Sequence, residues 1–139
     1  MTYTITTTID APFDDAVAAV MTALQDEGFG ILCDIDVKTT LKEKLDVDVD
    51  QYRILGACNP PLAHEGLVEE PDLGALLPCN VVVYETDAGD VVVSAVDPQQ
   101  LVAITENSEL DGIATEVHER FERVLAVVTD QLTTESELQ

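Results

Sequence analysis

Two valine-rich runs joined by a short polar segment constrain the fold of this sequence more than any other feature. Residues 81–84 read Val-Val-Val-Tyr, residues 91–94 read Val-Val-Val-Ser, and Asp-Ala-Gly-Asp occupies residues 87–90. β-Branched runs separated by a few turn-forming residues are typical of a β-hairpin. The chain is therefore expected to contain an antiparallel strand pair, around which the rest of the fold is built.

Three further segments show strand patterns. Residues 3–9 alternate Thr with Tyr or Ile, residues 31–37 alternate apolar residues with Leu and Asp, and residues 52–57 read Tyr-Arg-Ile-Leu-Gly-Ala. Alternation with a period of two predicts a strand with one buried face. By the same alternation, we expect Cys33 to point into the core on the same side as Ile31. The sheet should have about five strands and be mainly antiparallel.

Helical periodicity separates these strands. Residues 12–27 and residues 109–130 carry apolar side chains at three- and four-residue steps, which predicts two amphipathic helices. Asn59, followed by two prolines, is a suitable N-cap for another helix. Shorter helical segments are expected over residues 39–45, 62–70 and 73–77, with an irregular, partly helical stretch over 98–108. These elements predict a two-layer α+β fold in which helices cover one face of the sheet.

The length of 139 residues suits one hydrophobic core. We therefore expect a single α+β domain over residues 1–132. The polar residues 133–139 should form a frayed tail.

Acidic residues dominate the charge of the chain. Asp and Glu number 28 against 6 Lys and Arg, a formal charge of −22, and they occur in nearly every segment. Such a charge destabilises a compact state in dilute buffer, whereas at 1 M salt the Debye length shrinks to about 3 Å and the repulsion is screened. This pattern favours a halophilic cytoplasm. The alternative is an acidic protein that binds cations or basic partners, but its acids should gather in one patch. Nucleic-acid binding is disfavoured because it needs a basic face.

The sequence also bears on location. It shows neither a secretory signal nor an apolar run near the ~20 residues that cross a bilayer, so we expect a cytoplasmic protein that does not bind membranes. Three cysteines are an odd number without tight pairing, which suits a reducing compartment.

Several motifs resemble a known family. Tyr-Arg-Ile-Leu-Gly-Ala-Cys-Asn-Pro occupies residues 52–60, Leu-Pro-Cys-Asn-Val occupies residues 77–81, and Gly-Phe-Gly occupies residues 28–30. With the segment at residues 36–44, these motifs make the chain similar to the domain of unknown function 302 family over nearly its whole length. The resemblance implies a compact α+β domain that tends to form homodimers, and it brings no established activity.

Cys58 and Cys79 are the main candidates for chemistry. Cys58 ends a predicted strand just before a helix start, where backbone N–H groups can lower a thiol pKa. If the third and fourth strands are neighbours, the two sulfur atoms come close, and with His64 they would supply ligands for zinc or another thiophilic metal. The alternatives are a nucleophilic or redox thiol at Cys58, and a purely structural role as small buried side chains.

Basic residues form a second candidate site. Lys38, Lys42 and Arg53 could converge on an anion if the short helix folds back over the third strand. Alternatively, they pair locally with acidic residues such as Asp34 and Asp46. His118, beside the apolar stripe of the last helix, is expected to be a boundary residue with a satisfied ring nitrogen.

Two classes of function remain. The leading hypothesis is a non-catalytic domain that binds a small ligand, a metal or a partner, in which Cys58, Asn59, Cys79 and Asn80 line a shared pocket. The competing hypothesis is a thiol-dependent enzyme or redox protein that uses Cys58. Ordinary hydrolases and nucleotide enzymes are disfavoured, because the sequence lacks their nucleophile, phosphate-loop and dinucleotide motifs.

Overall fold

The computed structural model describes residues 2–138, and the side chains of residues 2–132. Within residues 2–138, five strands and five helices follow one another, with two short 3₁₀ helices. The strands are β1 (Thr4–Ile9), β2 (Gly30–Asp36), β3 (Tyr52–Cys58), β4 (Cys79–Glu85) and β5 (Val91–Val96); the helices are α1 (Phe13–Asp26), α2 (Val37–Leu45), α3 (Pro60–Glu69), η1 (Pro71–Leu76), α4 (Pro98–Ala103), η2 (Ser108–Leu110) and α5 (Asp111–Leu138).

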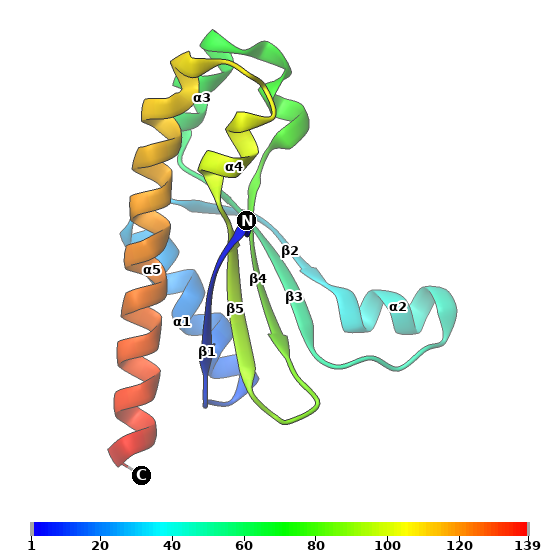
Figure 1. The fold of residues 1–139 in the computed structure, drawn as a ribbon. Coiled ribbons are helices and arrows are strands. Elements are labelled where there is room, and N and C mark those ends of the chain that lie inside the picture. Colours follow the sequence, from blue (N-terminus) through cyan, green and yellow to red (C-terminus); the bar gives the residue numbers. More distant parts are fainter. Residues whose placement is uncertain (1, 139) are drawn as a thin grey trace.

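The strands form one sheet in the order β1-β5-β4-β3-β2, and every neighbouring pair is antiparallel (Figure 1). The predicted hairpin is present as β4 and β5, in which Val83 lies opposite Val93. The expected α+β fold with about five strands is thus confirmed.

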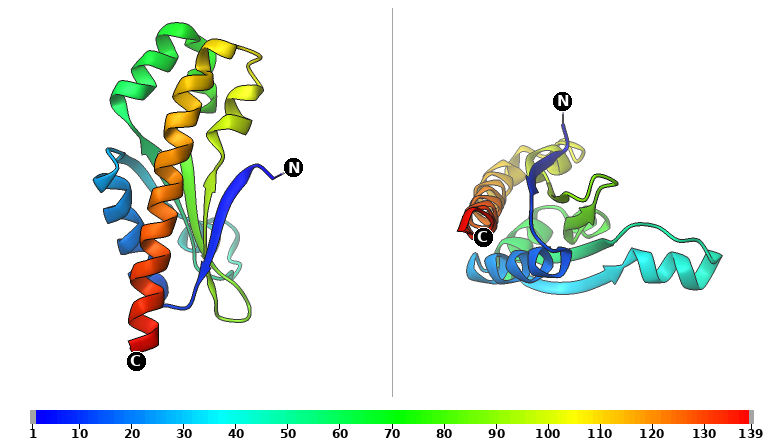
Figure 2. Two further views of the ribbon diagram at one scale, coloured as in Figure 1. Left: turned by 60° about the vertical axis from the view of Figure 1, so that its left-hand side comes forward. Right: turned by 90° about the horizontal axis from the view of Figure 1, so that it is seen from below.

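Helices α1 and α5 cover one face of the sheet, as two views of the ribbon make clear (Figure 2). Alternate residues of the central strands point toward them, among them Leu55, Val83 and Val93, which are fully buried. Phe29 stacks on Phe121 of α5 with ring centroids 4.9 Å apart. This face holds the main core, since burial of aliphatic and aromatic surface is the dominant favourable term in folding.

A β-bulge in β2 corrects the expected position of Cys33. Ile31 pairs with Ala57 and Cys33 pairs with Gly56, so Leu32 is the extra residue between them. Because the bulge shifts the alternation by one residue, Ile31 and Cys33 point to opposite faces. Cys33 is therefore not a core residue. It is half-buried beside Gly56, on the face of the sheet opposite α1 and α5, which we call the open face.

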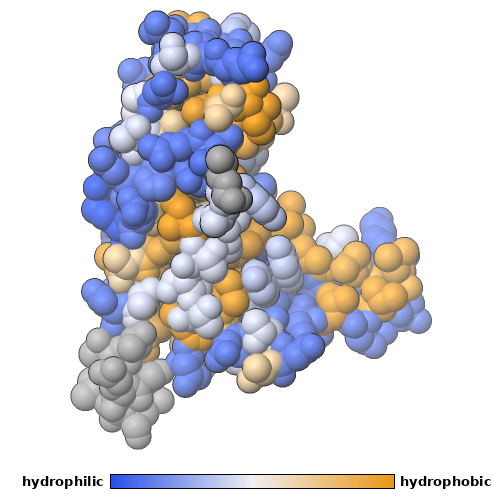
Figure 3. Space-filling model, viewed as in Figure 1, coloured by the Kyte–Doolittle hydropathy of each residue, from blue (hydrophilic) through white to orange (hydrophobic). Residues whose placement is uncertain are grey.

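A cap closes one end of the sheet and consists of α3, η1, α4, η2 and the first turns of α5. It has a small hydrophobic cluster of its own, built from Leu73, Val102, Leu110 and Ala114. Apolar side chains also reach the surface in the cap, which forms the upper end of the molecule in Figure 3. Between the cap and the sheet lies a hollow, at the edge where β3 ends and β4 begins.

The helix α2 and the loop after it project from the body as an arm (Figure 1). No residue of α2 is buried, and Asp36 caps its N-terminus by accepting a hydrogen bond from the backbone N–H of Thr39. This bond holds the pKa of the Asp36 carboxyl below its ordinary value. Residues 46–50 form an exposed connection rather than a strand, as expected.

The last helix is longer than its sequence pattern indicated. α5 continues to Leu138, so residues 133–138, expected as a separate frayed tail, extend the helix, and Gln139 lies outside the described residues. Within the part of the chain that the structure describes, no helix combines the length and apolarity needed to cross a bilayer.

Candidate functional site

The pairing of β3 with β4 brings Cys58 and Cys79 together. Ala57 lies directly opposite Cys79 in this ladder, and Cys58 is the next residue and the last of β3. Both cysteines are free, half-buried and part of the lining of one cavity. The third and fourth strands are thus neighbours, which is the condition for the predicted proximity of the two sulfur atoms.

The cavity has a volume of about 340 Å³ and lies between the end of the sheet and the cap. Phe29, Ala57 and Val117 belong to the side of the main core, whereas Ala63 of α3 and Leu101 of α4 belong to the cap. Its surface is almost entirely apolar, and none of its described lining residues carries a charge. We call this space the cap cavity.

Asn59 joins the cap cavity to the framework of the fold. Its side chain is buried; Oδ1 accepts a hydrogen bond from the backbone N–H of Leu62 at 3.2 Å, and Nδ2 donates one to the carbonyl oxygen of Gly28 at 3.3 Å. The first bond is the N-cap of α3 that the sequence predicts. The second ties α3 to the end of α1, so the wall of the cavity is anchored to the core.

Burial determines the protonation of Cys79. Removal from water, with a smaller contribution from neighbouring Cys58, raises the pKa of the Cys79 thiol to about 11. At neutral pH Cys79 is therefore an uncharged thiol. An uncharged thiol is a weak nucleophile and a poor metal ligand.

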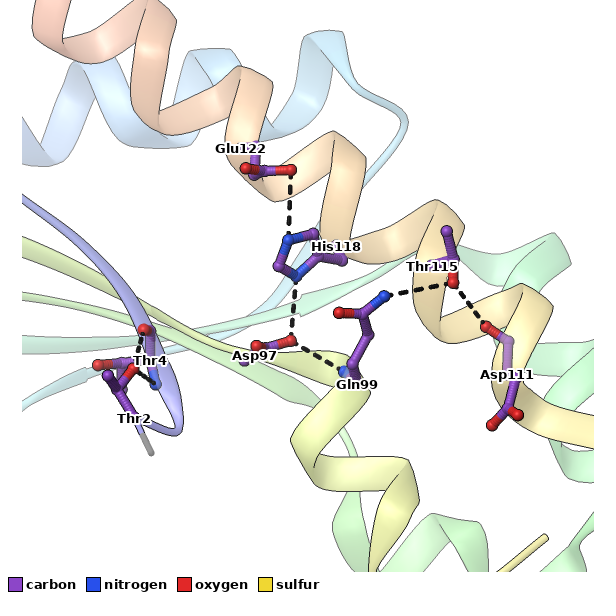
Figure 4. A network of polar contacts seen from close by, with 8 residues as sticks. All are labelled: Thr2, Thr4, Asp97, Gln99, Asp111, Thr115, His118 and Glu122. Atoms are coloured by element: carbon purple, nitrogen blue, oxygen red, sulfur yellow. Dashed lines mark hydrogen bonds and ion pairs between the residues drawn. The ribbon is translucent and has the colours of Figure 1, made fainter. Parts of the chain in front are cut away.

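A network of polar contacts attaches α4 to α5 beside the cavity (Figure 4). Oδ1 of Asp97 accepts a hydrogen bond from the backbone N–H of Gln99 and lies 3.0 Å from Nδ1 of His118. Nε2 of His118 lies 3.2 Å from Oε1 of Glu122, so both ring nitrogens have partners. Thr115 accepts a hydrogen bond from the side chain of Gln99 at 3.3 Å. These contacts hold α4 in place over the cap cavity.

His64 does not line the cap cavity with the two cysteines. It is exposed on α3 and lines a second, more open hollow of about 460 Å³ between α3 and α5, together with Glu65, Glu69 and Glu109. Within the described part of the chain, no three His, Cys, Asp or Glu side chains are arranged to hold a metal ion. The structure therefore does not assemble Cys58, Cys79 and His64 into the zinc site that their order in the sequence allowed.

The basic residues do not converge on an anion site. Nζ of Lys38 donates a hydrogen bond to the carbonyl oxygen of Val49 at 2.7 Å, and Lys42 forms ion pairs with Asp46 and Asp48. Arg53 forms a two-pronged contact with Asp34, which raises the pKa of Arg53. Local pairing with acidic residues, the alternative prediction, is present for Lys42 and Arg53, whereas Lys38 binds a backbone carbonyl oxygen.

Asn80 is exposed and does not line the cap cavity. Sequence reasoning also missed most of the cavity wall, notably Phe29, Leu62, Ala63 and Leu101. Their signal in the sequence is only that of ordinary apolar positions on strands and helices. A residue on the wall of a cavity and one in a filled core have the same periodicity.

The comparisons with known proteins agree with this architecture. A family model described as "Domain of unknown function DUF302" matches residues 5–128. The crystal structure of an uncharacterized conserved DUF302 protein from Bacillus stearothermophilus is similar, with 28% sequence identity and a TM-score of 0.82 over 95% of this chain and 99% of that chain. No curated protein matches the chain.

Proposed function

Because the chain belongs to the DUF302 family, whose name assigns no activity, we propose from its geometry that it is a non-catalytic domain that binds a small molecule in the cap cavity. One observation carries this proposal: a space of about 340 Å³ with an almost wholly apolar surface, at the end of the sheet, lined by both Cys58 and Cys79. Pockets of roughly 300–1,000 Å³ with such linings are typical of sites for small molecules.

The proposal is supported by the way the cavity is built. The polar side chain of Asn59 is committed to Leu62 and Gly28, and Asp97 holds α4 through His118. The walls are thus attached to rigid elements, and a pre-formed cavity reduces the cost of ordering the protein when a ligand binds.

Titration with the neutral fluorophore 1-naphthylamine, which is small enough for the cavity, tests the proposal. We expect a saturable blue shift of its fluorescence with one site per chain, and loss of this shift in Ala63→Phe, because a phenyl group would project from α3 into the cavity. The matched control is Ala18→Phe, the same change at an exposed position of α1 outside the cavity. Binding that survives Ala63→Phe, in a variant whose circular dichroism shows a native fold, would contradict the proposal.

We also propose that the protein forms a homodimer through the open face of the sheet. The side chains that point away from α1 and α5 include Thr6, Ser94, Val82, Ile54 and Tyr84, and none of the described strand residues on this face is charged. This face is turned toward the viewer in Figure 3, where its tones are mostly pale. In a chain with a net charge of −22, only an uncharged face lets two copies approach without strong repulsion.

Sedimentation in molar KCl tests the dimer. We expect wild-type protein to sediment as a dimer and Val82→Glu, which places a carboxylate on the open face, as a monomer. Val68→Glu introduces the same charge at an exposed position on α3 and should leave the dimer intact. A monomeric wild-type protein would overturn this proposal without affecting the cavity.

The acidic surface supports a third proposal, that this domain works in a salt-rich, halophilic cytoplasm. Arg53 pairs with Asp34, Arg123 pairs with Glu27, and Lys42 pairs with two aspartates. The chain has 28 Asp and Glu but only 6 Lys and Arg, so these cations can neutralise only a minority of the carboxylates. Such a surface is compatible with a stable compact state when salt screens the repulsion.

A further inference from the structure

The chemistry of the cap cavity narrows the class of ligand. Its described lining includes apolar side chains from β2, β3, α3, η1, α4 and α5, and no Lys, Arg, His, Asp or Glu. A carboxylate or an ammonium group that entered would lose its hydration without gaining a partner of opposite charge. The lining therefore disfavours ions of either sign.

The few polar groups in the lining are already occupied. Both ends of the Asn59 side-chain amide form hydrogen bonds within the protein, and Cys79 is an uncharged thiol at neutral pH. Among the described residues, no buried side-chain nitrogen or oxygen lacks a hydrogen-bond partner. The cavity thus offers a ligand little more than weak contacts with thiol groups.

The surface beside the cavity also disfavours anions. The open hollow between α3 and α5 shares Leu62 and Ile113 with the cavity wall and carries Glu65, Glu69 and Glu109. These carboxylates add to the negative field of the whole chain. An anion is repelled outside and finds no cation inside.

The size of the cavity limits the ligand as well. A cavity of about 150 Å³ holds one benzene molecule, so about 340 Å³ is enough for roughly a dozen non-hydrogen atoms. Leu32, at the β2 bulge, is 64% exposed and Leu67 of α3 is 38% exposed, and both line the cavity. They form an apolar rim through which such a molecule can enter.

We propose that the cap cavity binds a neutral, largely hydrocarbon molecule of roughly a dozen non-hydrogen atoms, and discriminates against carboxylate and ammonium ions of the same shape. This inference rests on the proposed function of the cavity and specifies its ligand class. The apolar lining supplies the affinity, since the transfer of each methylene group of the ligand from water into the cavity is favourable. The absence of charged partners in the described lining supplies the selectivity.

Three probes with one alkyl chain test the ligand class: n-octanol, octanoate and octylammonium. Each competes with 1-naphthylamine at neutral pH in molar KCl, which screens the net charge of the chain so that the result reports the chemistry of the lining. We expect n-octanol to displace the fluorophore, and both ions to need at least ~10-fold higher concentrations. An ion that competes as well as n-octanol overturns the ligand class but leaves the cavity as a binding site. Failure of all three probes and of the fluorophore overturns the proposed function itself.

A gain-of-binding variant makes the test sharper. Leu67→Lys places an ammonium group at the rim and should improve octanoate binding several-fold while n-octanol binding changes little. The matched control is Val68→Lys, the next position of α3, which lines the open hollow and not the cavity. Equal gains in the two variants would mean that octanoate binds through the general surface charge, and would overturn the assignment of this selectivity to the cavity.

Discussion

Oδ1 of Asp97 lies 3.0 Å from Nδ1 of His118 and accepts a hydrogen bond from the backbone N–H of Gln99. One carboxylate oxygen thus caps α4 and ties it to α5, across 21 residues of sequence. Since Leu101 and Val102 of α4 line the cap cavity, this contact positions one of its walls.

Loss of the Asp97 side chain should loosen the cap. We expect Asp97→Ala to lower the free energy of unfolding by about 1–2 kcal/mol, because α4 loses its cap and His118 loses a partner. Asp97→Asn keeps a capping oxygen and should cost less. In a double-mutant cycle of Asp97→Ala with His118→Ala, measured by chemical denaturation, a coupling energy of zero would show that the contact contributes nothing.

A side chain at Gly28 should destabilise the protein. Its φ of 88° lies in the left-handed region, and a Cβ atom there would be 3.0 Å from Nη1 of Arg120 and from Nδ2 of Asn59. Gly89 has nearly the same φ, 91°, but open space around it. We therefore expect Gly89→Ala to cost about 1 kcal/mol for conformation alone, and Gly28→Ala about 1–2 kcal/mol more for the crowded contacts. Equal unfolding midpoints for the two variants would contradict the close packing at Gly28.

The raised pKa of Cys79 predicts a pH dependence of stability. The folded state binds the thiol proton more tightly than the unfolded state, whose cysteine has the ordinary pKa of 9.0, so the stabilisation is complete below pH 9 and is lost as pH rises toward about 11. Between pH 9 and pH 11, we expect the free energy of unfolding of wild-type protein to fall by up to about 2 kcal/mol from this group. The fall should be smaller in Cys79→Ala. Cys33→Ala, on the open face, is the control and should keep the wild-type profile.

The same protonation bears on the thiol-dependent alternative. In folded protein near pH 7.5, Cys79 should react slowly with a disulfide reagent, and denaturant should expose it. In a variant that combines Cys33→Ala with Cys79→Ala, the reagent reports on Cys58 alone. Rapid reaction of Cys58 in the folded state would favour a redox or nucleophilic role over simple binding.

Salt should stabilise the protein strongly. Because the net charge is −22, raising KCl from about 0.1 M to about 2 M should increase the free energy of unfolding by on the order of 2–5 kcal/mol through screening. Sucrose at equal osmolality is the control for general exclusion from the protein surface, and should stabilise less. A melting temperature that does not depend on KCl would remove the basis for proposing a halophilic cytoplasm.

Much of the fold was accessible from local patterns. The valine-rich hairpin, the two amphipathic helices and the capping role of Asn59 follow from alternation, helical periodicity and side-chain hydrogen bonding, which act over a few residues. The bulge at Leu32 left no comparable signal, because an inserted residue preserves the apolar character of the strand. For that reason Cys33 was expected on the wrong face.

The sequence by itself determined that the chain forms β-branched strands and amphipathic helices, and that the helices cover one face of the sheet. It also determined that the protein is strongly acidic. Only the tertiary structure decided that Cys58 and Cys79 share a cavity without His64, and that Lys38, Lys42 and Arg53 each find separate partners. The physical reason is range: helical and strand patterns arise from neighbours along the chain, whereas a cavity is the space left between elements distant in sequence. Its existence depends on how those elements pack, and its chemistry depends on which side chains the packing turns inward.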